Sequence, residues 1–119
     1  MHELAVCQAL LTQVQRVAAE HGAGAVRRIV LKLGPLSGVE PQLLRRAFDV
    51  ARLGGIAAEA ELSIEPIGVR VRCLECGAET DATANRLLCA QCGAWHTQLL
   101  SGEELVLQRV ELAPAAAAA

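Results

Sequence analysis

Four cysteines stand in two CxxC pairs, and no other residues of the chain are so clearly arranged for metal chemistry. Cys73 and Cys76 form the first pair, and Cys89 and Cys92 form the second after an interval of twelve residues. Zn(II) prefers four tetrahedral ligands, which two facing CxxC turns supply as thiolates. A glycine follows each pair and permits a turn tight enough for amides to point at sulfur. Because no ligand position is left for water or substrate, we expect a closed, structural zinc site.

Iron in the same cage, as in a rubredoxin-like electron carrier, is one alternative, and a zinc ribbon for nucleic-acid binding or protein interaction is another. A nucleic-acid binder needs basic residues and stacking aromatics. The chain has 13 acidic against 11 basic side chains, with one Phe and one Trp, which disfavours that class. We find no export signal and no apolar run long enough to span a bilayer. We therefore expect a cytoplasmic protein with reduced thiols and with no membrane or nucleic-acid partner.

The amino terminus offers a second set of metal ligands. The Met1 α-amine, the His2 amide nitrogen and the His2 imidazole can close adjacent five- and six-membered chelate rings on one ion. Nitrogen ligands in a plane suit Ni(II) or Cu(II). The fourth ligand could be the backbone nitrogen or the carboxylate of Glu3. The motif alone is weak, since a histidine at the second position is usually a solvated residue near a helix start.

Hydrophobic periodicity predicts the elements that position these residues. Apolar residues at helical spacing predict helices over about 4–21 and 41–53. Alternating patterns predict strands over about 26–33, 61–66 and 105–112. The predicted fold is α+β, a small three-stranded sheet with two helices on one face, plus an inserted zinc-ribbon-like lobe.

Several single residues have simpler explanations than metal binding. Cys7 lies on the predicted apolar face of the first helix and is expected to be buried and inert. His96 follows the second CxxC pair, but four sulfurs already complete a tetrahedral shell. Trp95 is expected to pack the small lobe against the sheet or a loop.

Four segments together resemble the HypA/HybF family. They are Met1-His2-Glu3, Gly34-Pro35-Leu36-Ser37-Gly38-Val39, the two CxxCG turns and Ser101-Gly102-Glu103-Glu104-Leu105. The likeness continues in order to about Leu112. Ala90 departs from the proline that many relatives have in the second CxxC, which affects turn rigidity and no ligand.

The resemblance implies a nickel metallochaperone for [NiFe]-hydrogenase maturation and not an enzyme. A nickel-binding α/β domain, 1–68 with 101–113, would use His2 as its essential ligand beside Met1 and Glu3. An inserted domain, 69–100, would bind zinc, and 114–119 would be an Ala-rich tail. The implied partners are a HypB-type GTPase and the hydrogenase large subunit. A second copy of the chain is a further candidate partner.

Overall fold

The structure is a computed structural model that describes residues 2–113. The predicted Ala-rich tail and Met1 lie outside the described residues. The element order is α1 (His2–Glu20), β1 (Ala25–Leu33), α2 (Pro41–Ala51), β2 (Glu61–Pro66), β3 (Val69–Cys73), β4 (Glu79–Ala82), β5 (Thr97–Ser101) and β6 (Leu105–Ala113). Within the described part, no helix is both long and apolar enough to cross a membrane.

The chain divides into two compact units, and each contains a three-stranded sheet. The first unit comprises Met1–Leu31, Val39–Ile64 and Leu107–Ala119, and the second comprises Lys32–Gly38 and Glu65–Val106. Strands in the first sheet follow the order β2-β1-β6, and those in the second follow the order β4-β3-β5.

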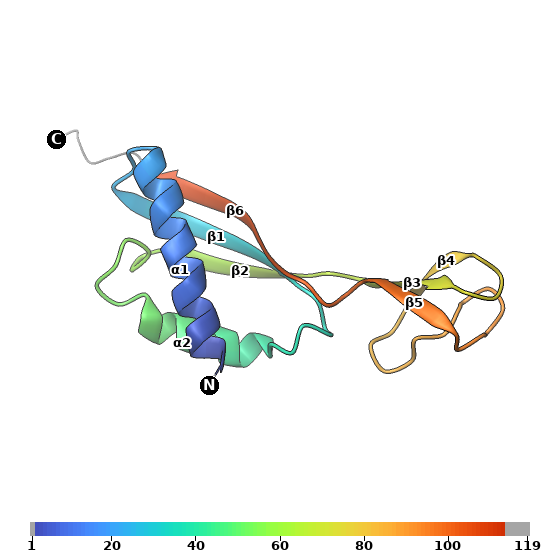
Figure 1. Cartoon of the computed structure of the whole chain (residues 1–119). Coiled ribbons are helices and arrows are strands. Elements are labelled where there is room, and N and C mark those ends of the chain that lie inside the picture. Colours follow the sequence, from blue (N-terminus) through green and yellow to red (C-terminus); the bar gives the residue numbers. More distant parts are fainter. Residues whose placement is uncertain (1, 114–119) are drawn as a thin grey trace. The chain divides into compact units, whose positions relative to one another are not determined.

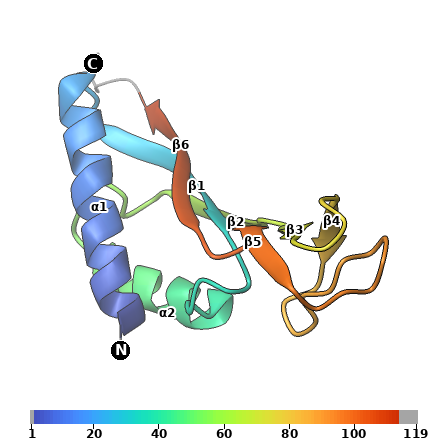
Figure 2. The same cartoon turned by 45° about the vertical axis from the view of Figure 1, so that its right-hand side comes forward.

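In the first unit, α1 and α2 cover one face of the β2-β1-β6 sheet (Figure 1 and Figure 2). The helices bury residues spaced three or four positions apart, as amphipathic helices do. The buried apolar set is Cys7, Leu11, Val14 and Ala18 on α1, with Leu44 and Phe48 on α2. The predicted α+β arrangement, with two helices on one face of a small sheet, is therefore confirmed.

Local signals explain where the helices begin and end. Glu40 precedes α2 and its carboxylate accepts a 2.9 Å hydrogen bond from the Leu43 amide, which satisfies a donor that the helix cannot. Pro41 follows in the first turn, where its missing N–H costs nothing. At the end of α1, Gly22 adopts a φ of 65°, and the conformational freedom of glycine allows the chain to reverse there.

In the second unit, β3 is the central strand and pairs antiparallel with β4 and β5. Val69, Val71 and Cys73 are buried, whereas Arg70 and Arg72 between them are exposed. The sequence did not indicate these three strands. The flanking strands are only four and five residues long and are nowhere fully buried, so they lack the alternation that identifies a longer half-buried strand.

The glycine of the Gly34-Pro35 segment lies against the turn at Gly102 within the second unit. The Gly34 amide donates to the Glu104 carbonyl at 2.8 Å, and the Leu36 amide donates to the Gly102 carbonyl at 2.8 Å. A Cβ atom on Gly34 would lie 2.1 Å from the Gly102 carbonyl oxygen. Two of the motifs quoted above are therefore bonded to each other, and their contact requires a residue without a side chain.

Candidate metal sites

The four paired cysteines come together at one end of the β4-β3-β5 sheet. Cys73 is the last residue of β3 and Cys76 lies in the turn after it, whereas Cys89 and Cys92 lie in the loop between β4 and β5. Their sulfur atoms all lie within 4.8 Å of one another. The Cys73–Cys92 and Cys76–Cys89 sulfur distances are 3.6 and 3.7 Å. A tetrahedral ion with bonds of about 2.3 Å separates its sulfurs by about 3.8 Å, so the spacing suits one ion.

The two CxxC turns have the same backbone hydrogen bonds. In each, the amide of the first cysteine donates to the carbonyl five residues later, and its carbonyl accepts from the glycine four residues later. The bonds are Cys73 to Ala78 (2.8 Å) and Gly77 to Cys73 (3.0 Å), then Cys89 to Ala94 (3.0 Å) and Gly93 to Cys89 (2.9 Å). Both glycines have positive φ, 80° at Gly77 and 79° at Gly93, which explains the glycine after each pair.

Main-chain amides point at the sulfur of the first cysteine in each turn. Cys73 Sγ accepts from the amides of Glu75 and Cys76, each at 3.3 Å. Cys89 Sγ accepts from the amides of Gln91 and Cys92, each at 3.4 Å. Amides aimed at sulfur stabilise a thiolate, the form that binds metal.

The thiols differ in acidity in a way that fits a bound cation. The Cys92 amide lowers the pKa of Cys89 to about 6. Although the Ala94 amide acts in the lowering direction, the neighbouring Cys73 sulfur and desolvation raise the pKa of Cys92 to about 12. The sulfurs on their own therefore do not all ionise near neutral pH. A divalent cation offsets the mutual repulsion of four thiolates, so this donor set suits such an ion.

Trp95 and His96 lie just beyond the second CxxC turn. The Trp95 side chain is 78% exposed, so the prediction that it packs the lobe against the sheet or a loop was wrong. His96 Nδ1 lies 3.5 Å from a carboxylate oxygen of Glu75, and the His96 carbonyl accepts from the Leu74 amide at 2.9 Å. The imidazole of His96 is not needed as a ligand, because the four cysteine sulfurs already supply a tetrahedral set.

The amino-terminal residues lie at the start of α1, which begins at His2. Met1 lies outside the described residues. His2 Nε2 lies 3.4 Å from Glu3 Oε2, so these two candidate ligands are adjacent. The Glu3 side chain is buried, with the residue only 7% exposed, which the sequence did not indicate.

The buried Glu3 carboxylate lies against the backbone of Glu40. Desolvation raises the pKa of Glu3, but the amides of Glu3 and Glu40 and the His2 side chain together lower it below its ordinary value. The carboxylate is therefore ionised at neutral pH. Glu40 is itself exposed, and its carboxylate caps α2. The signal for its role was the following proline, since a polar residue before Pro at the first turn is typical of a helix cap.

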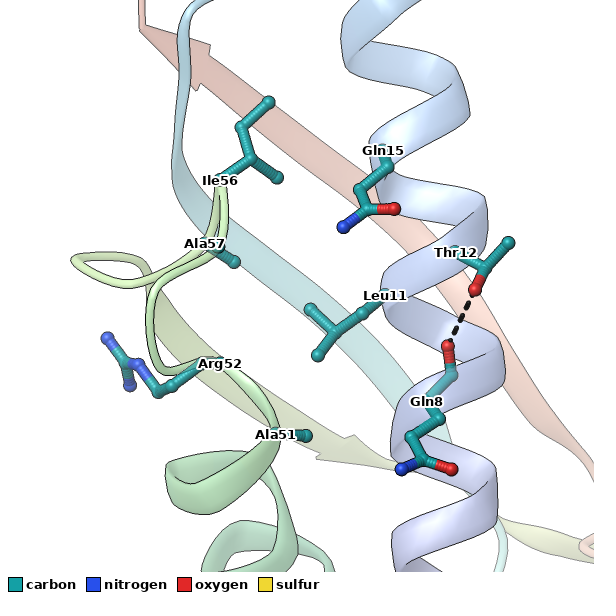
Figure 3. Close-up of a pocket in the computed structure, with 9 residues that line it drawn as sticks. Gln8, Leu11, Thr12, Gln15, Ala51, Arg52, Ile56 and Ala57 are labelled. Atoms are coloured by element: carbon teal, nitrogen blue, oxygen red, sulfur yellow. Dashed lines mark hydrogen bonds between the residues drawn. The ribbon is translucent and has the colours of Figure 1, made fainter.

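The first unit also has a shallow pocket of about 230 Å³ beside α1 and the residues that follow α2 (Figure 3). Its lining includes Gln8, Thr12, Gln15, Leu11 and Arg52. Arg52 donates hydrogen bonds of 2.6–3.0 Å to main-chain carbonyls of its own loop. The lining contains no cysteine, histidine or carboxylate, so the pocket offers none of the side chains that commonly bind metal.

Cys7 is the fifth cysteine and lies apart from the other four. It is 1% exposed, and its sulfur lies 3.5 Å from the Leu44 carbonyl oxygen. Burial raises the pKa of Cys7 to about 11. The expected burial of this thiol is confirmed, and a thiol with such a high pKa is unreactive at neutral pH.

Comparison with known proteins gives one consistent family. A family profile described as "Hydrogenase/urease nickel incorporation, metallochaperone, hypA" matches residues 1–112. This chain belongs to the HypA family. The hydrogenase maturation factor HypA of Nitrosospira multiformis is 45% identical over 112 residues, covering 94% of this chain and 97% of that protein. The Aquifex aeolicus HypA is 39% identical over the same shares of both chains.

The fold of the HypA family is also found here. The solution structure of the Ni metallochaperone HypA from Helicobacter pylori superimposes with a TM-score of 0.69 at 23% identity, covering 94% of this chain and 97% of that one. The family resemblance predicted from the sequence motifs is thus confirmed. Membership makes this chain one of the metallochaperones of hydrogenase and urease nickel incorporation.

Proposed function

We propose that this protein captures Ni(II) at its amino terminus and delivers it to the large subunit of a [NiFe]-hydrogenase together with a HypB-type GTPase. The family match over residues 1–112 carries this proposal. Hydrogenase is preferred as the recipient because the relatives at 45% and 39% identity are named hydrogenase maturation factors. The protein itself catalyses no reaction, and its place of action is the cytoplasm.

The proposed nickel ligands are the Met1 amine, the His2 amide and the His2 imidazole, with Glu3 completing the set. A six-membered ring that includes the His2 amide must use Nδ1 of the imidazole, because Nε2 is too far along the ring. The 3.4 Å contact between Nε2 and the Glu3 carboxylate involves the other nitrogen. It supports the proposal because a carboxylate on the second nitrogen orients a metal-binding imidazole.

The start of a helix also suits an ionised amide as a ligand. The first four N–H groups of an α-helix have no carbonyl acceptor within that helix, and His2 and Glu3 are the first residues of α1. Replacing the His2 amide proton with a metal therefore breaks no hydrogen bond of the helical ladder, whereas the Glu3 amide already hydrogen-bonds the Glu3 carboxylate. Glu3 would supply the fourth ligand through either its backbone nitrogen or its carboxylate.

The proposed role of zinc is structural and separate from nickel transfer. Cys73, Cys76, Cys89 and Cys92 would hold Zn(II) as four thiolates, with the two CxxC turns locked by their own backbone bonds. Bound zinc stabilises the small lobe and leaves no open coordination position. Nickel, in contrast, must leave the protein, and ligands at a chain terminus can release it without unfolding a unit.

The test is a nickel titration of protein with an untagged amino terminus, compared with its His2→Ala variant. We expect one nickel per wild-type chain and loss of that binding in the variant, with zinc content and circular dichroism unchanged. His21→Ala is the matched control. His21 is also exposed and directly follows α1, but it is distant in sequence from the amino terminus. Equal nickel stoichiometry and affinity in wild type and His2→Ala would defeat the assignment.

A further inference from the structure

Two large apolar side chains of the second unit are exposed to solvent beside the CxxC turns. Trp95, the only tryptophan of the chain, is 78% exposed, and Leu74 is 52% exposed. The Leu74 amide donates a 2.9 Å hydrogen bond to the His96 carbonyl, so the turn with Leu74 lies beside the segment with Trp95. Tryptophan is usually largely buried, and it is enriched where proteins bind one another. The pair therefore indicates an interaction surface.

Two polar side chains extend this surface from the indole ring. The Trp95 and His96 ring centroids lie 5.3 Å apart, with the rings tilted by 31°. The His96 Nδ1 atom lies 3.5 Å from Glu75 Oε2, and both of these side chains are more than half exposed. An exposed carboxylate thus lies within one imidazole of an exposed indole. We call Leu74, Glu75, Trp95 and His96 together the Trp95 surface.

The carboxylate of Glu75 gives this surface a negative charge that the nearby arginines do not cancel. The Arg70 guanidinium lies 2.6 Å from the Asp81 carboxylate, and that of Arg72 lies 2.7 Å from the Glu79 carboxylate. Two of the three arginines in residues 69–100 are therefore already paired. In the proposed zinc site, four thiolates around a divalent ion would add further negative charge next to Glu75.

We infer that the Trp95 surface docks a segment of another protein in which an arginine stands next to an apolar residue. The face of an indole attracts a guanidinium, which stacks flat on it. The Glu75 carboxylate offers an ion pair to the same cation, and Leu74 provides apolar contact for the neighbouring residue. The surface lies in the second unit and contains none of the proposed nickel ligands, so this inference goes beyond metal capture.

Charge complementarity favours a basic protein segment over other occupants. A nucleic acid could stack a base on Trp95, but its phosphates would be repelled by Glu75 and by a thiolate-bound ion. A second copy of this chain carries a formal net charge of −2, which opposes its approach to a negative surface. An arginine-bearing segment instead gains attraction from both the ring and the carboxylate.

Titration of short peptides into the tag-free, zinc-loaded chain tests the inference, because the single tryptophan reports directly on the surface. The probes are the acetylated and amidated peptides Gly-Leu-Arg-Leu-Gly and Gly-Leu-Glu-Leu-Gly, which differ only in the central residue. We expect a saturable change in Trp95 fluorescence with the arginine peptide. The glutamate peptide should bind at least roughly tenfold more weakly, since it loses the stacked cation and places like charges together.

Variants of the surface separate its two contributions. Glu75→Gln removes the charge at nearly constant size and should weaken binding of the arginine peptide roughly two- to fivefold. Leu74→Ser should also weaken it. Leu53→Ser is the matched control, because Leu53 is 75% exposed but belongs to the first unit, and it should leave binding unchanged. Zinc content and circular dichroism check that each variant keeps its fold.

Each contrary result has a definite meaning. Equal affinity for the two peptides, or no saturable change with the arginine peptide, would overturn the inference. Equal weakening by Leu53→Ser and Leu74→Ser would overturn it as well. Trp95 fluorescence that changes on dilution of the chain alone would assign the surface to a second copy and would also overturn it. Nickel binding by Glu75→Gln should match that of the wild type, so failure of the peptide test leaves the proposed nickel site unaffected.

Discussion

Glu3 lies at the start of α1 beside His2, and its carboxylate is held by the backbone of a residue 37 positions further along the chain. Amides lower its pKa, so the group carries its charge at neutral pH although it is buried. A fixed anion next to an imidazole sets the ring's orientation. In the proposed nickel site, the Glu3 carboxylate would therefore orient the His2 imidazole, and the Glu40 backbone holds that carboxylate in place.

Gly34→Ala should destabilise the second unit, because the new Cβ would lie 2.1 Å from the backbone oxygen of Gly102. Backbone cannot move aside as a flexible side chain can, so we expect a loss of about 1–3 kcal/mol in unfolding free energy. Gly68→Ala is the matched control in the same unit, since nothing lies within 4 Å of its added Cβ. Chemical denaturation of both variants measures the effect. Equal midpoints for the two would contradict the close contact at Gly34.

At the scale of elements, the two CxxC turns form one proposed zinc site, because each turn supplies two of its four cysteine ligands. The turns repeat the same backbone bonds, but each pairs a sulfur with one in the opposite turn, at 3.6 and 3.7 Å. Small units with few buried residues depend on such a metal for stability. Zinc binding and folding of the second unit should therefore be coupled.

Cys76→Ala should lower zinc affinity and increase amide hydrogen exchange in β3 and β5, because three thiolates hold zinc less firmly and the zinc site opens. Protection in α1 should remain, since its buried face packs in the other unit. Cys7→Ala removes a thiol outside the site and should keep one zinc per chain. Zinc retained at full affinity with unchanged exchange in β3 would contradict the coupling.

The longer elements with clear hydrophobic periodicity could be predicted from sequence, whereas the short strands and the long-range contacts could not. The strands expected at 26–33, 61–66 and 105–112 are found within one residue at each end. The β3, β4 and β5 strands were not predicted: β4 and β5 are short and nowhere fully buried, and the alternation of β3 extends over only five residues. The burial of Glu3 could not be predicted because an acidic residue near a terminus is usually solvated. The group that its carboxylate contacts, the Glu40 backbone, is also remote in the sequence. The cysteine cluster was predictable because the CxxC spacing constrains its geometry locally.

At the scale of the whole molecule, the two candidate metal sites fall in different compact units. The proposed nickel ligands belong to the first unit and the four cysteines to the second. The proposed nickel site would exchange its ion at the amino terminus, whereas the four cysteines would hold zinc between two turns with matching backbone hydrogen bonds. Under the proposed function, placing the two sites in separate units would let nickel be released while zinc stays bound.

The proposed nickel site depends most directly on a free α-amine at Met1. The decisive measurement is calorimetric titration of nickel into the tag-free chain with a free amino terminus and into the same chain acetylated at that nitrogen, with zinc quantified in both samples. We predict one bound nickel for the free amine, loss of that binding after acetylation, and one zinc per chain in each. Unchanged nickel binding by the acetylated protein would contradict capture at the amino terminus.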